Sequence, residues 1–249
     1  TSLLSMSLDG SFSDGQKQPG EREVTTTLSL LRLGYYFEIA DLPAVAYVQG
    51  AAGETDLGGL LAPIKGDSGF DDTVFLLAIW PYADNSSRTY WGIGAYLFVP
   101  TGSYDNELGL FSVGKNRYAA ALQTGFQAAL DSNFIIMTAF DATWFGSNDD
   151  FTVDHLKLEQ RPLATAQAAL TYQLTPEYSL SGGYFYTFGG EYVLEGVAQD
   201  NANSTHRYQV TAAAQYPIGR ITMQYGGDLK RENGLFEDRR LIFRYIRAF

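Results

Sequence analysis

The chain has 249 residues, no cysteine and a formal net charge of −11. The acidic balance argues against nucleic acid as a partner, because phosphate binding needs a basic surface, and the absence of cysteine excludes disulfides and thiolate metal sites. The most apolar run, Phe75 to Trp80, is far shorter than the about 20 residues of a transmembrane helix. A transmembrane β-barrel is still compatible with this composition, since only every second residue of its strands faces lipid.

Alternation of apolar and polar residues runs along the chain in about twelve segments, close to the about 9–11 residues of an outer-membrane strand. In Thr89 to Val99 the odd positions begin with Trp91 and Ile93, and the even ones carry Tyr90, Tyr96 and Phe98. The pattern recurs at 134–144, 164–174 and 208–216. Helical periodicity is absent from all of these windows.

The connectors alternate between short and long. Short turns are expected at 41–43, 84–87, 130–133, 175–177 and 217–219, where Pro, Asn, Asp and Gly turn the chain. Long, polar, Gly-rich loops are expected at 13–22, 53–69, 100–116, 146–162, 189–205 and 230–237. This rhythm is typical of short periplasmic turns and long extracellular loops. The sequence therefore predicts an all-β fold, a monomeric twelve-stranded antiparallel transmembrane β-barrel that forms a single domain over residues 1–249. We expect Thr1 to begin a mature or trimmed chain, because no signal peptide is visible.

The last segment, Leu241 to Phe249, is expected to be a strand with an aromatic face that ends on Phe249. Outer-membrane barrels commonly end this way, and the terminal Phe249 resembles the signal that their assembly machinery reads. Arg247 breaks the pattern, and a position near the membrane interface would let it snorkel.

The cost of charge in lipid assigns the two faces, because an Arg or Lys at the bilayer midplane costs about 2–4 kcal/mol. The almost uncharged set is expected to face lipid: Trp91, Leu97, Phe134, Phe140, Leu170, Tyr172, Tyr184, Tyr216, Tyr225 and Phe243. The polar set is expected to face the interior: Arg32, Glu38, Gln123, Gln127, Asp141, Gln167, Gln173, Gln209, Gln215, Arg220, Gln224 and Arg244.

Inward arginines are expected to form a basic wall near the closure of the barrel. The predicted lumenal charge network consists of Arg32, Glu38, Asp141, Arg207, Arg220, Asp228, Arg240 and Arg244. One interpretation is an ion-pair network that stiffens the lumen, because buried charges must be paired. The other is a transverse field along a pore. Acidic residues of the expected loops, such as Asp67, Asp72 and Glu191, serve either solubility or a weakly cation-favouring pore mouth.

The loop Pro100 to Asn116 contains apolar residues that water would not favour. It is interpreted either as a constriction folded into the barrel or as a packed outer cap. The expected pore-lining residues are Tyr90, Tyr96, Phe98, Tyr104, Asp105, Leu108, Leu110, Phe111, Val113 and Arg117. Tyr104 is a candidate gate.

Chemistry has few candidates in this sequence. The two histidines, His155 and His206, show no metal-ligand spacing, so we expect no metal site, no cofactor and no catalytic residue. A phospholipase-like site would need a Ser–His arrangement on the lipid-facing wall. A protease-like site would need acidic pairs beside a histidine, which Asp149, Asp150 and His155 could imitate.

Several short motifs carry a resemblance to a family. They are Leu30 to Glu38 followed by Leu42–Pro43–Ala44, Pro100 to Asp105, Gly114 to Arg117, and Phe145 to Asp150. Together they resemble the outer-membrane channel family named for the MetA pathway of phenol degradation, over nearly the whole chain.

The resemblance implies a passive channel for small hydrophobic or aromatic molecules in the outer membrane of a Gram-negative bacterium. Expected partners are membrane lipid, lipopolysaccharide, such solutes and the assembly machinery. A barrel hydrolase and a structural barrel with a blocked lumen are the alternatives.

Overall fold

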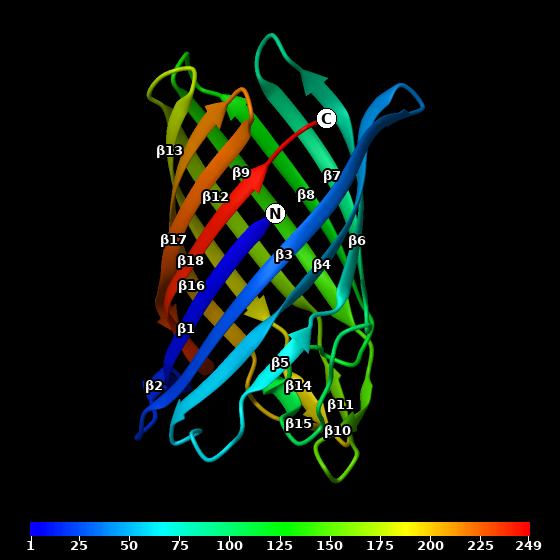
Figure 1. The fold of residues 1–249 in the computed structure, drawn as a ribbon, viewed down its shortest axis with the longest axis vertical. Coiled ribbons are helices and arrows are strands. Elements are labelled where there is room, and N and C mark those ends of the chain that lie inside the picture. Colours follow the sequence, from blue (N-terminus) through cyan, green and yellow to red (C-terminus); the bar gives the residue numbers. More distant parts are fainter.

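A computed structural model describes residues 1–249 and shows a closed antiparallel barrel of 12 strands (Figure 1). Every strand pairs with its neighbours, and the last strand pairs with the first, so the barrel has no free edge and its backbone groups are satisfied without water. The barrel strands are β1 (Ser2–Ser13), β3 (Arg22–Ile39), β4 (Leu42–Gly59), β6 (Thr73–Asp84), β7 (Thr89–Val99), β8 (Ala119–Ala129), β9 (Phe134–Phe145), β12 (Leu163–Gln173), β13 (Tyr178–Gly189), β16 (Asn203–Tyr216), β17 (Gly219–Arg231) and β18 (Gly234–Ile246).

The remaining elements are short. The strand β2 (Gln16–Lys17) pairs with β1, and β5 (Asp67–Phe70) pairs with β4. A separate four-stranded sheet contains β10 (Asn148–Phe151), β11 (Leu156–Gln160), β14 (Tyr192–Leu194) and β15 (Val197–Ala198). A single 3₁₀ turn, η1, covers Gly109–Phe111. No helix has the length and hydropathy needed to cross a membrane.

The two ends of the barrel differ (Figure 1). Short turns and both chain termini lie toward the upper end of the view, whereas β5 and the small sheet gather at the lower end. The predicted rhythm of short and long connectors is therefore confirmed, and the lower end is the one with the long extracellular loops.

Two of the predicted long loops are wrong in their bounds. The segment 53–59 continues β4, because Thr25–Thr27 on β3 pairs with Glu54–Asp56 without a break. The segment 230–237 is a hairpin, since β17 ends at Arg231 and β18 begins at Gly234. Both segments are rich in polar residues, and for this reason the sequence predicts loops there. A strand that projects beyond the lipid can be polar on both faces.

The end of the final strand also differs from the prediction. The strand β18 ends at Ile246, so Arg247, Ala248 and Phe249 lie beyond the ladder, and Phe249 is fully exposed. The Arg247 guanidinium lies over the Phe249 ring, 5.1 Å from its centroid. The predicted aromatic face is nevertheless present up to Tyr245, because Phe243 pairs with the outward Leu3 of β1.

The lumen and its loop as candidate functional site

The strands divide their side chains between lipid and lumen as the alternation predicts. On β7 the odd residues Trp91, Ile93 and Leu97 are each about two-fifths exposed or more, as outward residues of an isolated barrel should be. The even residues Tyr90 and Tyr96 lie opposite Gln127 and Ala121 of β8, on the lumenal face.

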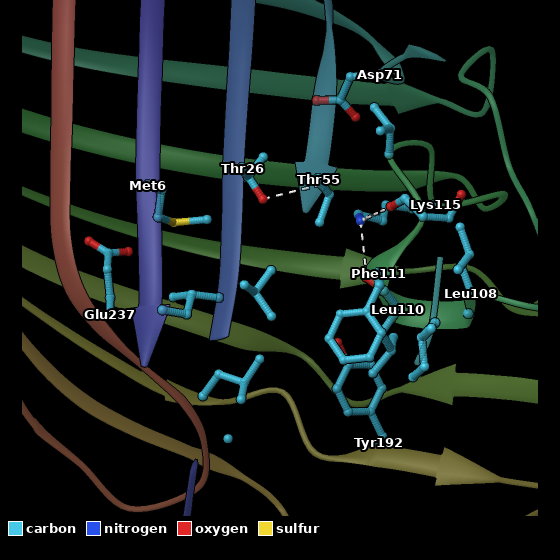
Figure 2. A pocket seen from close by; sticks show the side chains of 18 of the residues that line it. Met6, Thr26, Thr55, Asp71, Leu108, Leu110, Phe111, Lys115, Tyr192 and Glu237 are labelled. Carbon is cyan, nitrogen blue, oxygen red and sulfur yellow. Dashed lines mark hydrogen bonds between the residues drawn. The ribbon is translucent and has the colours of Figure 1, made fainter. Parts of the chain in front are cut away.

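The first large cavity lies toward the loop end of the lumen and has a volume of about 880 Å³. Barrel residues form one side of it, among them Met6, Leu8, Val24 and Leu28. Residues of the β7–β8 loop form another side: Leu108, Leu110, Phe111 and Val113. Figure 2 shows Phe111 and Leu110 of the loop across the cavity from Met6 and Glu237 of the wall. Apolar loop residues therefore face the inward residues of β1 and β3.

Two carboxylates hold this loop in place. Asp67 of β5 accepts hydrogen bonds from the Ser112 hydroxyl at 2.9 Å and the Val113 backbone N–H at 2.7 Å. Asp72 accepts from the backbone N–H groups of Gly102 at 3.0 Å and Lys115 at 3.1 Å. Charge-assisted bonds of this kind are stronger than neutral ones, so both ends of the loop are fixed to the segment between β4 and β6.

Lys115 stiffens the loop from inside. Its ammonium donates to the carbonyl oxygens of Ser112 at 2.5 Å and Leu110 at 3.3 Å (Figure 2). The side chain keeps some exposed surface, but that surface faces the enclosed lumen, and this enclosure lowers the pKa of Lys115. Burial likewise raises the pKa of the neighbouring Asp71 carboxyl. The two groups offset each other's charge beside the cavity.

Three of the expected pore-lining residues hold the loop and do not line the large cavities. The Tyr104 hydroxyl donates to the carbonyl oxygen of Asp150 at 3.1 Å, and Asp105 accepts from the Glu107 N–H at 2.9 Å. Arg117 donates to Gln160 at 2.6 Å and lies 4.5 Å from the Phe145 ring centroid. These contacts join the loop to itself, to β9 and to the small sheet.

The motifs at 100–105, 114–117 and 145–150 meet at the base of the β7–β8 loop. A Cβ on Gly114 would lie 2.6 Å from the Ser103 oxygen, so only glycine fits there. Asn116 donates to Asn148 at 3.0 Å. Gly146 donates its N–H to the Tyr118 oxygen at 2.8 Å. These motifs therefore build the support of the loop.

A second cavity of about 670 Å³ lies toward the short-turn end. Tyr90 and Tyr96 line it, together with Tyr36, Leu76 and Gln167. Phe98 stacks on Tyr96 with ring centroids 6.5 Å apart, and the Tyr96 hydroxyl donates to Gln123 at 3.2 Å. This part of the lumen therefore has aromatic and amide groups side by side.

The inward charges form one tight cluster and several isolated groups. In the cluster, Glu237 is 2% exposed and contacts Arg240, while Arg207 lies 4.0 Å from the same carboxylate. Asp228 pairs with Arg231 at 2.8 Å. Glu237 and Arg231 were not among the expected network, because residues 230–237 were assigned to a loop. No carboxylate lies within 4.0 Å of the isolated arginines, which are Arg32, Arg220 and Arg244.

The expected acids of the network are not all near the arginines. Asp228 lies in the cluster, but Asp141 lies on β9 and accepts from Gln123 at 3.5 Å. Glu38 lies opposite Pro43 at the short-turn end and has no ion-pair partner. The acidic loop residues Asp67, Asp72 and Glu191 are also not simply solvated, because each accepts a backbone hydrogen bond.

The histidines lie apart, on different elements. His155 contacts Asp150 on the β10–β11 hairpin, and this bond, followed by one from Asn106, lowers the pKa of Asp150. His206 lies on β16 with its ring stacked on Tyr186, and its Nδ1 contacts the Tyr184 hydroxyl. His206 thus faces the lipid side, but its partner is a tyrosine and no serine. The structure contains no cluster of His, Asp and Glu that could hold a metal ion.

A family model described as "Putative MetA-pathway of phenol degradation" matches residues 9–245. The chain belongs to this family. No curated protein matches the sequence. The outer membrane channel from Pseudomonas putida F1 has a similar structure, with a TM-score of 0.95 and 28% identity over 100% of this chain and 93% of that one. The family member described here is therefore a β-barrel channel of the outer membrane.

More distant structures share the barrel alone. The KdgM porin matches with a TM-score of 0.50 and 11% identity, over 100% of this chain and 99% of that one. The transport unit of the autotransporter AIDA-I from Escherichia coli matches with a TM-score of 0.51 and 10% identity, over 100% and 89% of the two chains.

Proposed function

We propose that this protein is a passive diffusion channel for small hydrophobic or aromatic molecules in the outer membrane of a Gram-negative bacterium, and that the loop 100–116 narrows its lumen. The observation that carries the proposal is the cavity of about 880 Å³ that Leu108, Leu110, Phe111 and Val113 share with apolar residues of the barrel wall. An apolar solute that leaves water there gains about 25 cal/mol for each Å² of apolar surface that it buries.

The size of the barrel supports a narrowed passage. Eight-stranded barrels are filled by side chains and porins of 16–18 strands keep an open aqueous channel, so a barrel of 12 strands lies between them. The Asp67 and Asp72 carboxylates also fix the loop through hydrogen bonds from Ser112 and Lys115. A cap that moved freely outside the barrel would not need these bonds.

The remaining parts of the proposal concern partners. We expect the outward rings to lie in lipid, the polar strand ends near β5 to meet lipopolysaccharide, and Phe249 to be available to the assembly machinery because it lies outside the ladder. The chain closes its barrel alone, so a second copy is not needed for the passage.

Uptake measurements test this function. Cells with an intact lipopolysaccharide layer, with and without the gene, would be given radiolabelled toluene and naphthalene. We expect initial uptake to be several-fold faster with the gene. Equal uptake, with the protein folded in the membrane, would overturn the proposal. The same purified protein should show neither lipase nor protease activity, because His206 has no serine partner and His155 lies in a separate hairpin.

A structural barrel with a blocked lumen is the second candidate. The hydrogen bonds of Lys115 favour the blocked barrel, because they stiffen the loop that lies beside the first cavity. Conductance in planar bilayers separates the two candidates, because a blocked barrel carries no current steps.

A further inference from the structure

The two lumenal cavities are separated by a short segment of the barrel that lines neither of them. On β3, Leu28 lines the first cavity and Tyr36 lines the second, and Arg32 lies between them on the same face. On β4, Thr55 and Pro43 line the two cavities, and Tyr47 lies between them. We call the segment formed by Arg32, Tyr47, Gln49 and Arg244 the neck.

Arg244 reaches the neck from the closing strand. Arg240 of β18 lines the first cavity, and Arg244 lies four residues farther toward the short-turn end. Ser2 pairs with both Arg244 and Leu30, so Arg244 and Arg32 are separated by one strand and two residues. Both side chains lie on the lumenal face, because Arg244 shares its face of β18 with Arg240 and Arg32 shares its face of β3 with Leu28.

The two neck arginines have donors to spare. Arg32 uses Nε and Nη2 on one oxygen of Gln49, at 3.1 and 2.6 Å, and lies 4.1 Å from the Tyr47 ring centroid. Arg244 donates only to the Ser2 hydroxyl, at 3.4 Å. Neither has a carboxylate within 4.0 Å. Two like charges without a counter-ion repel each other, and an anion between them removes that repulsion.

An aromatic surface begins at the same level. Tyr47 and Tyr96 meet edge to face with centroids 6.4 Å apart, and Phe98 continues the row at 6.5 Å. A ring that lies against this row would place a substituent carboxylate beside Arg32, because Arg32 covers the first ring of the row. Guanidinium groups bind carboxylates through two parallel hydrogen bonds.

We infer that the neck is a binding site for a small aromatic monocarboxylate. Arg32 and Arg244 would bind its carboxylate, and the rings of Tyr47 and Tyr96 would contact its ring. The inference rests on the proposed function and specifies its solute class. It also opposes the weak cation preference that the acidic loops suggest, because the two neck arginines have no carboxylate within 4.0 Å.

Current measurements in planar bilayers and uptake measurements in cells together test the role of the neck. The variants are Arg244→Gln, Arg32→Gln, the charge-conserving Arg244→Lys, and the matched control Arg239→Gln, which removes the same charge from the outward face of the same strand. Folding of each variant is checked by heat-modifiable mobility on gels, and Arg32→Gln serves if Arg244→Gln does not fold.

The wild-type channel should be anion-selective in a KCl gradient, and benzoate should reduce its chloride current. Arg244→Gln or Arg32→Gln should weaken the benzoate effect and benzoate uptake by about tenfold, the loss expected for one charge-assisted contact. Arg244→Lys should retain part of the effect, and Arg239→Gln all of it.

Two results would overturn the inference: a cation-selective wild-type current, or neck variants that behave like Arg239→Gln. Uptake of neutral toluene separates this failure from failure of the proposed function. If toluene enters through the channel but benzoate gains nothing from the arginines, only the neck is refuted. If toluene does not enter, the proposed function is refuted as well.

Discussion

The Asp67 carboxylate accepts a hydrogen bond from the Ser112 hydroxyl at 2.9 Å, and Ser112 has no exposed surface. The two residues are 45 positions apart in the sequence, one on β5 and the other at the end of η1. This bond joins the turn that presents Leu110 and Phe111 to the wall beside β4. The position of the β7–β8 loop beside the first cavity therefore depends on a few polar contacts.

Replacing Asp67 should release the loop. Asp67→Asn removes the charge from the bonds to Ser112 and Val113, and each bond to a charged group contributes about 1.5–3 kcal/mol. We expect an increase of about tenfold or more in the frequency of open-state fluctuations in single-channel recordings. The control is Asp56→Asn on β4, which has the same chemistry on an exposed residue. Equal behaviour of the two variants would show that Asp67 does not hold the loop.

The close contact at Gly114 makes a second prediction. Gly114→Ala places a methyl group 2.6 Å from the Ser103 oxygen and 2.8 Å from the Gly102 carbonyl carbon, so the loop base must move. We expect faster cleavage of the loop by an added protease, while the barrel stays folded. Gly50→Ala is the control, because a Cβ there meets nothing within 4 Å. An unchanged cleavage rate in Gly114→Ala would contradict the described packing.

The partition of faces predicts a difference between neighbouring positions of β12. Leu170 is 44% exposed on the outward face, so Leu170→Arg should reduce the free energy of unfolding from phospholipid bilayers by about 2–4 kcal/mol. Gln167→Arg adds the same charge to the lumenal face and should cost much less. Denaturant titration in vesicles measures both, and equal losses would reject the assignment of faces.

The Asp150–His155 contact predicts an acid-dependent step in the β10–β11 hairpin. The lowered pKa of Asp150 means that its bonds stabilise the hairpin above the ordinary carboxyl pKa of about 4. The contribution is lost as the pH falls through the lower folded value. Site-specific NMR titration should show this step, and Asp150→Asn should remove it. A pKa at or above the ordinary value would contradict the contact.

The pKa of Asp71 is shifted in the opposite direction to that of Asp150, so its effect on stability at low pH is also opposite. Its pKa is raised by burial, so protonation at falling pH favours the folded loop relative to the unfolded chain. A global melting curve mixes the two effects, and this is why the measurement must be made residue by residue.

The barrel itself could be predicted from the sequence, because a period of two in side-chain character is imposed by lipid on one face and water on the other. The segment Thr89 to Val99 became β7 with its bounds unchanged. Where strands project beyond the membrane, lipid no longer imposes a period of two, and the predicted strand bounds were wrong there. The polar residues Glu54–Asp56 lie in β4, and residues 234–237, which follow the polar turn after Arg231, already lie in β18.

The support of the loop could not be predicted from the sequence. Asp67 and Asp72 had the appearance of solvated loop acids, because nothing in their local sequence points to Ser112 or Lys115, more than 40 residues away. The small sheet was missed for the same reason, since β11 finds its partner β14 across the whole of β12 and β13. Long-range pairing of short polar segments leaves no periodic signal.

One measurement tests the central claim, that the barrel is a passage whose lumen contains the β7–β8 loop. The chain has no cysteine, so Phe111→Cys and the outward Leu97→Cys each carry one thiol. Both variants are recorded in planar bilayers before and after addition of a charged methanethiosulfonate reagent. We predict current steps in both, and a clear drop in conductance on modification of Cys at position 111 alone. Absence of current steps, or an unchanged conductance after modification at 111, would contradict the account.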